Sequence, residues 1–174
     1  MKEILNIRHF QKDNYNYLQK RNLTDIHHAV KDPNVLRKET APHDGQIWLL
    51  NAGIVVDNDA ILYINSSDTS SLKIIADGKT AYLIHVLGSL KIDSVKVTSW
   101  NPNTNNYATT EDSDRNGRDV KVGTPRPYIV VEKGATGTTD ITNSEIAYLG
   151  YLRSLVCPCT DKEKAVGWAP QWQP

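Results

Sequence analysis

Residues 54–60 read IVVDNDA and residues 129–135 read IVVEKGA, so three aliphatic residues followed by a polar turn recur at an offset of 75. A second pair, residues 82–88 (YLIHVLG) and 128–134 (YIVVEKG), aligns at an offset of 46. If these offsets are three and two turns of one coil, each turn uses about 23–25 residues, a length typical of solenoid repeats.

Short apolar runs separated by Gly, Asn, Asp and Ser continue through residues 46–151, and no helical period lies between them. A second element, an isoleucine followed within three residues by a serine, comes after each repeat, at Ile64, Ile92 and Ile141. The missing helices exclude βαβ units. Stacked turns pair their strands and bury aliphatic ladders, so we predict an all-β parallel solenoid of about four turns. An antiparallel sandwich, which also gives many short strands, is the alternative.

The repeat predicts that Ile54, Leu83 and Ile129 lie in one inward ladder. Residues 1–45 do not share the repeat, and we interpret them as an N-terminal helical or irregular cap. The apolar face of a helix in this cap would comprise Ile4, Ile7, Phe10, Tyr17 and Leu18.

The predicted coil has an open end after Tyr151, followed by an irregular tail over residues 152–174. Exposed strand edges invite pairing with other chains, and terminal turns of solenoids normally carry a cap. We therefore expect the tail, through Trp168 and Trp172, or a second subunit of a homo-oligomer to cover this end.

The charge balance limits the classes of partner that the chain can bind. Twenty Lys and Arg residues balance twenty Asp and Glu residues among the 174, which argues against the broad basic surface of a nucleic-acid-binding protein. No run approaches the ~18 apolar residues of a membrane span. The N-terminus lacks the apolar segment of a signal peptide, so we expect a cytoplasmic chain or an export signal outside this sequence.

We predict neither a metal site nor a cofactor. The adjacent His27 and His28 cannot share one helix face, and Cys157 and Cys159 alone cannot complete a zinc site. Residues 112–117 (DSDRNG) match the first half of a calcium loop, but its twelfth position holds Gly123 where a glutamate belongs. We interpret this loop as a solvated charged segment, with a calcium site involving Asp119 as the alternative.

Three stretches resemble one known family: residues 91–102 (KIDSVKVTSWNP), 126–137 (RPYIVVEKGATG) and 138–151 (TTDITNSEIAYLGY). They are similar to rungs of the right-handed parallel β-helix proteins known as mannuronan, or alginate, epimerases. The resemblance covers residues 46–151. It implies a right-handed parallel β-helix, an isomerase acting at carbon five of a uronate, an anionic uronate-rich polysaccharide as partner, and an extracellular or cell-surface location.

The chain departs from the family after Tyr151. Family members continue into rungs with an Asn-Asn-x-His-His-like segment and an Asp-Pro-His-Asp-type motif, to which the resemblance would assign catalysis. Here residues 152–159 read LRSLVCPC instead. Residues 41–44 (APHD) echo the acidic histidine motif but lie before the first predicted strand, so no catalytic role is carried onto them. The resemblance thus implies the N-terminal part of an epimerase-like coil.

Epimerisation at carbon five needs a group that neutralises the carboxylate, a base, and an acid on the opposite face. The arginines that could bind the carboxylate are Arg115, Arg118 and Arg126. The side chains that could transfer a proton are Tyr82, His85, Tyr107 and Tyr128. No spacing pairs an acid with a base, and His85 fits equally well as a hydrogen-bonded wall residue, so we assign no catalytic residue.

The long polar loop over residues 101–125 would project from the coil beside aromatic side chains. Aromatic rings stack on sugars, and arginine presents a planar fork to a carboxylate. We therefore predict a substrate-binding site for an anionic polysaccharide made of Trp100, Tyr107, Arg118 and Arg126. A non-catalytic polysaccharide-binding module and a structural surface module are the alternatives.

Overall fold

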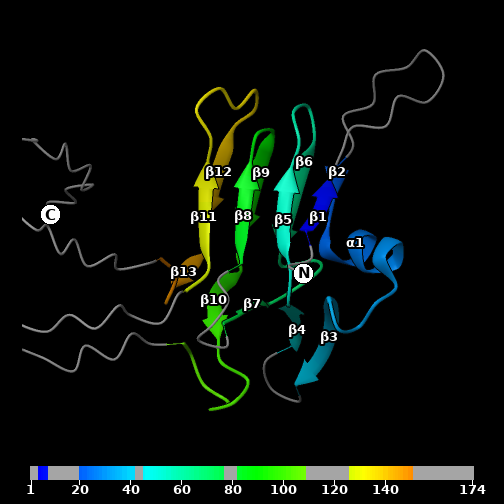
Figure 1. Ribbon diagram of the computed structural model, residues 1–174, viewed down its shortest axis with the longest axis vertical. Helices are drawn as coiled ribbons and strands as arrows, with labels where there is room; N and C mark the ends of the chain where they lie inside the picture. The colour runs from blue at the N-terminus through cyan, green and yellow to red at the C-terminus, as the bar shows by residue number, and fades with distance from the viewer. Residues whose placement is uncertain (1–3, 8–19, 42–44, 77–81, 109–125, 151–174) are drawn as a thin grey trace, which may run out of the picture.

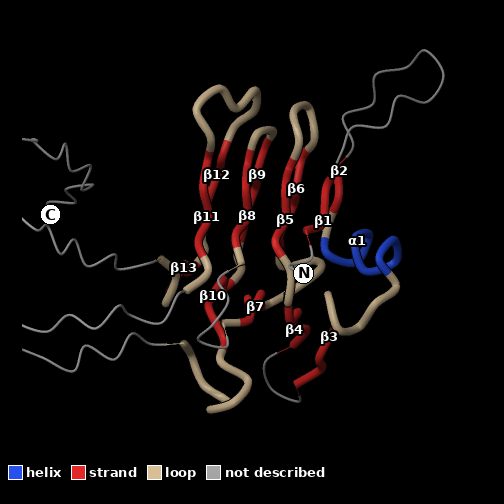
Figure 2. The backbone as a smooth tube through the Cα atoms, in the orientation of Figure 1, coloured by secondary structure: helices blue, strands red, loops and turns tan. Residues whose placement is uncertain are grey.

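The computed structural model describes residues 4–7, 20–41, 45–76, 82–108 and 126–150. Its strands form three sheets that run side by side along the molecule (Figures 1 and 2). Sheet 1 contains β1 (Ile4–Ile7), β5 (Gly53–Val56), β8 (Leu83–Val86) and β11 (Tyr128–Val131). Sheet 2 contains β2 (Lys20–Arg21), β6 (Ile61–Asn65), β9 (Ser89–Asp93) and β12 (Thr139–Thr142). Sheet 3 contains β3 (Leu36–Ala41), β4 (Gly45–Leu50), β7 (Ser71–Ile75), β10 (Lys96–Trp100) and β13 (Glu145–Ala147).

From β4 onward, successive strands go to successive sheets, so each group of three, such as β8, β9 and β10, makes one rung. Neighbouring rungs pair in parallel in all three sheets, and among the described strands only β3 and β4 pair antiparallel. The arrangement is β-helix-like, as predicted in outline. The antiparallel sandwich is therefore the wrong alternative.

Aliphatic ladders fill the interior between the sheets. Ile64 is in register with Ile92, and Ile92 with Ile141, so the second repeated element aligns as the sequence predicts. Ile54 is in register with Ile84, and Ile84 with Ile129. Ile54, Ile64, Ile84 and Ile92 are fully buried, because every second residue of a strand points inward.

The predicted ladder is wrong at one position: Leu83 is not in register with Ile54, and its neighbour Ile84 takes the inward place. A shift of one residue moves a side chain to the other face of a sheet, and the aliphatic run around Leu83 gives no sign of which residue faces inward. The turn length is also corrected. One turn takes 30 residues from Ile54 to Ile84 and 45 from Ile84 to Ile129, so the offset of 75 is two turns, one carrying the long loop.

The first 41 residues contribute more than the predicted cap. Ile4–Ile7, expected on a helix, forms strand β1 and pairs in parallel with β5, which aligns Leu5 with Ile54 and Ile7 with Val56. Strand β2 pairs with β6 in the same way. Pairing with the edge of β5 thus outweighs the weak helical pattern of residues 4–7. Strand β4 begins at Gly45, within the predicted cap, while Phe10, Tyr17, Leu18 and the predicted tail lie outside the described residues.

The one helix of the described chain, α1 (Leu23–Val30), starts at a capping box in which Asn22 and Asp25 exchange side chain-to-backbone hydrogen bonds. The buried Asp68, before β7, accepts hydrogen bonds from the backbone N–H groups of Leu23 and Thr24 at 2.8 and 3.2 Å and from the Thr24 hydroxyl. These contacts fix α1 to the coil. In the part of the chain that the structure describes, no helix has the length and apolar character to cross a membrane.

Candidate functional site

The outer face of sheet 3 carries alternate residues of its strands. In β7, Leu72 and Ile74 are buried inside, so Ser71 and Lys73 point outward. In β10, Val97 is buried inside, which turns Lys96 and Trp100 outward. The register pairs Ser71 with Lys96 and Lys73 with Thr98, so both lysines lie on neighbouring strands.

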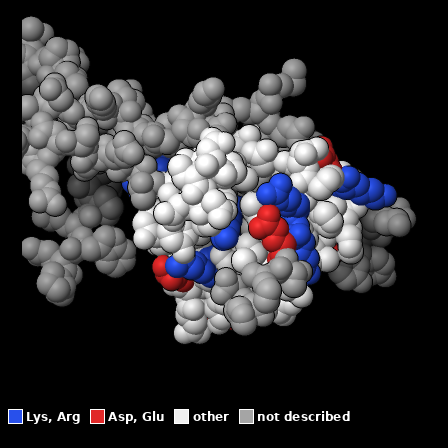
Figure 3. Space-filling view, turned by 90° about the horizontal axis from the view of Figure 1, so that it is seen from below, with Lys and Arg blue, Asp and Glu red and all other residues white. Residues whose placement is uncertain are grey.

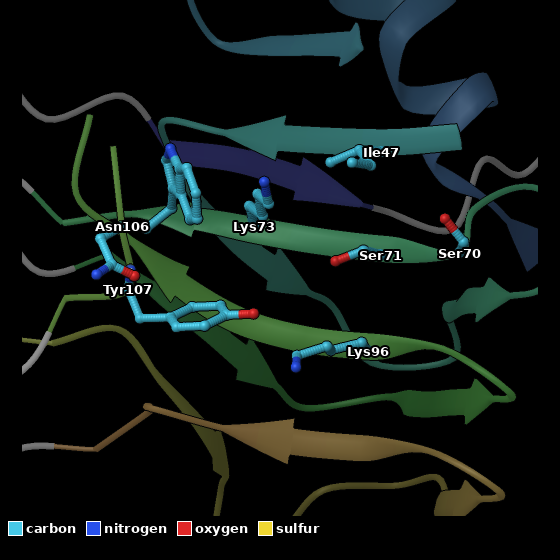
Figure 4. A pocket seen from close by; sticks show the side chains of 8 residues that line it. Ile47, Ser70, Ser71, Lys73, Lys96, Asn106 and Tyr107 are labelled. Carbon is cyan, nitrogen blue, oxygen red and sulfur yellow. The ribbon is translucent and has the colours of Figure 1, made fainter. Parts of the chain in front are cut away.

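A cavity of about 500 Å³ lies on this face. Its wall comes from β4, β7, β10 and the loop after β10 (Figure 4). The lining residues are Ile47, Ser70, Ser71, Lys73, Lys96, Trp100, Asn106 and Tyr107. The cavity thus combines two ammonium groups, two aromatic rings and short polar side chains.

The two rings and the two lysines contact each other in pairs. The Nζ atom of Lys73 lies 3.6 Å from the centroid of the Trp100 ring, and that of Lys96 lies 5.2 Å from the centroid of the Tyr107 ring. The Trp100 and Tyr107 rings meet edge to face, with centroids 5.9 Å apart and planes at 87°. Tyr148, after β13, stacks on Tyr107 with a centroid separation of 4.4 Å. Tyr107 is therefore clamped between two rungs.

A short polar turn positions Tyr107. Asn101 and Asn106 exchange backbone hydrogen bonds of 2.8 and 3.3 Å, which closes the loop directly after β10. The Asn101 side chain accepts a hydrogen bond from the Asn103 N–H at 2.9 Å, and Asn105 adopts a positive φ of 50° that asparagine tolerates well. The asparagine-rich sequence thus turns the chain back over the sheet, and the Tyr107 hydroxyl points toward Lys96 (Figure 4).

The two lysines differ in their electrostatic surroundings. Lys96 forms an ion pair of 3.1 Å with Glu145 of β13, and hydrogen bonds to Glu145 and Tyr107 raise its pKa above the ordinary value of 10.5. Lys73 has no acidic partner among the described residues. Seen from below, this side of the molecule shows clusters of Lys and Arg side chains with a few acidic groups beside them (Figure 3). The cavity therefore offers one lysine that is paired with an acid and one that is not.

The structure brings together two of the four residues predicted to bind substrate, Trp100 and Tyr107. Arg126 does not line the cavity; its Nε donates a hydrogen bond of 3.0 Å to the carbonyl oxygen of Gly150. Arg118 lies outside the described residues. Lys73 and Lys96 line the cavity but are not among the residues predicted from the sequence. Their strand alternation signals an outward position, but only the register of β7 on β10 shows that they share a cavity.

Of the other candidate catalytic residues, the structure places His85 away from this cavity. His85 is on the outer face of sheet 1, where its Nε2 contacts the carboxylate of Glu132 in the next rung. This contact agrees with the interpretation of His85 as a hydrogen-bonded wall residue. Arg115, the residues 112–119 of the candidate calcium loop and both cysteines lie outside the described residues. Within the described ranges, no group of three His, Cys, Asp or Glu side chains is placed to hold a metal ion.

No protein-family model matches the chain, and no curated protein matches it. Among solved structures, the fold is similar to that of the periplasmic alginate epimerase AlgG, with a TM-score of 0.59 and 21% identity over 78% of this chain. Two mutants of the same epimerase give the same TM-score at 23% identity. The chain spans 27% of the length of each of these structures. The resemblance to alginate epimerases is thus borne out for the fold, as a partial match.

Proposed function

We propose that this chain binds an anionic, uronate-rich polysaccharide on the outer face of sheet 3, in the cavity lined by Lys73, Lys96, Trp100 and Tyr107. The observation that carries the proposal is the pairing of two ammonium groups with two aromatic rings around one cavity. A uronate unit needs both kinds of group, because its ring has apolar faces and its carboxylate is charged. Aromatic rings supply the first contact and lysines the second.

We assign the two lysines different roles because their charge partners differ. Lys73 has no acidic partner in the described part of the chain, so it is the cation that a carboxylate meets first. Lys96 is shared with Glu145, and an arriving carboxylate competes with that side chain. Ser70, Ser71 and Asn106 add hydrogen-bonding groups for sugar hydroxyls at the cavity wall.

The fold likeness supports the same substrate class. We propose that the three sheets form a right-handed parallel β-helix of the alginate epimerase type and that the chain corresponds to part of such a coil. The rung-by-rung order of strands and the similarity to AlgG support this assignment. Because AlgG is an alginate epimerase, alginate is the first polysaccharide to test.

Epimerisation at carbon five is the second candidate, favoured by the same likeness. The described cavity fits only part of that chemistry. Like any lysine whose pKa is not lowered, Lys96 is protonated near neutral pH, so it suits charge neutralisation of a carboxylate and not proton abstraction. The Tyr107 hydroxyl is a proton-transfer candidate on one side of the cavity, and the described residues place no second such group opposite it. We therefore propose polysaccharide binding as the function of this chain, with or without catalysis.

The test is calorimetric titration of the full chain with alginate oligomers and with neutral dextran oligomers at low salt. We expect alginate to bind and dextran not to bind. Lys73→Gln should weaken alginate binding several-fold, and Trp100→Ala should weaken it further. The matched control is Lys91→Gln, which removes an outward lysine from sheet 2 and should leave binding unchanged. Equal binding by the Lys73→Gln chain, or equal binding of dextran, would refute the site.

Two further measurements separate the alternatives. Exchange of the carbon-five proton of alginate in deuterated water, followed by NMR, would establish epimerase-type chemistry. Binding without exchange would support a binding module, and absence of binding would leave a structural module. An Arg118→Ala and Arg126→Ala double variant tests separately whether the two predicted arginines contribute.

A further inference from the structure

Two side chains of residues 145–148, at and just after β13, contact the cavity of sheet 3. The carboxylate of Glu145 pairs with the ammonium group of Lys96 at 3.1 Å. The ring of Tyr148 stacks on the ring of Tyr107, with centroids 4.4 Å apart and planes at 7°. Lys96 and Tyr107 lie side by side at the cavity wall, and neither Glu145 nor Tyr148 is among its described lining residues (Figure 4). One cation and one ring of the proposed site are thus already in contact with the next rung.

These two contacts have the chemistry of a bound uronate unit. Such a unit presents a carboxylate and a ring with apolar faces, which are the features that Lys96 and Tyr107 would bind. Glu145 is in register with Lys96 across β10 and β13 and supplies the carboxylate. Tyr148 supplies a flat ring that lies nearly parallel to Tyr107 and covers one of its faces. The carboxylate and the ring therefore occupy the two groups as a uronate would.

The backbone of Tyr148 is strained. Its φ of 57° lies in the left-handed region, which a bulky side chain adopts only at a cost in free energy. The chain is anchored on both sides of this residue. Before it, β13 pairs with β10. After it, the Gly150 N–H donates a hydrogen bond of 2.8 Å to the Pro127 carbonyl, and the Gly150 carbonyl accepts one of 3.0 Å from Arg126. Departure of the Tyr148 ring from Tyr107 would let the strained φ relax, which lowers the cost of uncovering Tyr107.

The ion pair between Glu145 and Lys96 is also easily exchanged. The Glu145 side chain is 59% exposed, so its carboxylate is largely hydrated and an ion pair of this kind contributes little to stability. The other half of the cavity has no such internal partner: Lys73 lies over the Trp100 ring at 3.6 Å and contacts no acid among the described residues. The cavity therefore has an open half and a half that the chain itself occupies.

We propose that Glu145 and Tyr148 form an autoinhibitory contact, an internal competitor that a uronate-rich polysaccharide displaces from Lys96 and Tyr107. This inference rests on the proposed function and adds a regulation of the same site. An arriving carboxylate takes the place of Glu145 on Lys96, and a sugar ring takes the place of Tyr148 on Tyr107. A neutral sugar can replace the ring but not the carboxylate, so the contact also selects for charged polymers.

An internal competitor and a structural support differ in the sign of their effect on binding. If Glu145 and Tyr148 only hold Lys96 and Tyr107 in place, their removal disorders the site and weakens polysaccharide binding. The same loss is expected if Tyr148 itself binds a sugar. If they compete with the polysaccharide, their removal strengthens binding. The direction of the change in affinity therefore decides between these roles.

The test is calorimetric titration of the full chain and its variants with alginate oligomers at low salt. Glu145→Gln should tighten binding about two- to fivefold, the range of an exposed ion pair. Tyr148→Gly, which removes the ring and suits a positive φ, should tighten it about two- to tenfold, the range of an aromatic pair. The double variant should exceed both. The matched control is Asp140→Asn, which removes the same charge from an ion pair of 3.0 Å with Lys91 on sheet 2 and should leave affinity unchanged.

NMR gives a second readout in the unmodified chain: the ring protons of Tyr148 should shift toward the values of an unstacked ring as alginate saturates the site. If the parent chain binds alginate but these signals stay in place, or if Glu145→Gln and Tyr148→Gly bind no more tightly, the competitor is refuted and the proposed function stands. An equal gain for Asp140→Asn would show a mere effect of net charge and also refute it. Binding by the double variant alone would support the competitor, whereas no binding by any chain would overturn both proposals. If Tyr148→Gly does not fold, Glu145→Gln and the Tyr148 signals decide.

Discussion

Replacing Asp68 with alanine should destabilise the protein by detaching the start of α1 from the coil. The Asp68 carboxylate accepts three hydrogen bonds there: two from the backbone N–H groups of Leu23 and Thr24 and one from the Thr24 hydroxyl. Both Leu23 and Asp68 are buried, so water cannot easily replace the lost acceptor at the Leu23 N–H.

The magnitude follows from these bonds. A hydrogen bond to a charged group contributes about 1.5–3 kcal/mol, and loss of a helix N-cap costs about 0.5–2 kcal/mol. The three bonds share one acceptor and their contributions are not additive. Asn22 still caps Asp25, which limits the loss. We expect Asp68→Ala to lower the free energy of unfolding by about 2–4 kcal/mol, a large part of the ~5–15 kcal/mol typical of a domain.

The assay is urea denaturation followed by circular dichroism, with linear extrapolation to water. The matched variant is Asp68→Asn, which keeps an acceptor oxygen but removes the charge, and it should lose about half as much. A loss below about 1 kcal/mol for Asp68→Ala would refute the reasoning. So would equal losses for both variants, because the charged acceptor would then carry no special role.

Three other perturbations have expected outcomes. Glu145 and Tyr107 raise the pKa of Lys96 above 10.5, so the stability that this lysine contributes is complete below pH 10.5 and is lost as the pH rises through the raised pKa. The melting temperature should therefore fall less steeply between pH 9 and pH 12 in the Glu145→Gln variant than in the parent protein. Gly88→Ala should cost about 1–3 kcal/mol in urea denaturation, since its Cβ would overlap the carbonyl oxygens of Asp57 and Ala60 in the rung below. Alginate affinity should fall as salt rises from about 0.01 to 0.15 M, because the Debye length shrinks from about 30 to 8 Å; an affinity independent of salt would contradict a charged site.

The sequence predicts the part of the site that is local in the chain. Trp100 and Tyr107 are seven residues apart, and the asparagine-rich turn between them brings their rings together. Lys73 comes from the preceding rung, so its place over the Trp100 ring depends on the pairing of β7 with β10. No spacing along the chain predicts that contact. Arg126, predicted from its nearness to the loop, instead contacts Gly150.

Aliphatic runs and polar turns are local properties of the chain, so the sequence alone predicts the all-β class, the alignment of Ile54 with Ile129 and the alignment of the second repeated elements. The tertiary structure was needed to show that Ile84 and not Leu83 faces inward, that Ile4–Ile7 is a strand, and that two lysines share the cavity of sheet 3. These features depend on register between strands, and register is set by packing of whole rungs, where a shift of one residue exchanges the inner and outer faces.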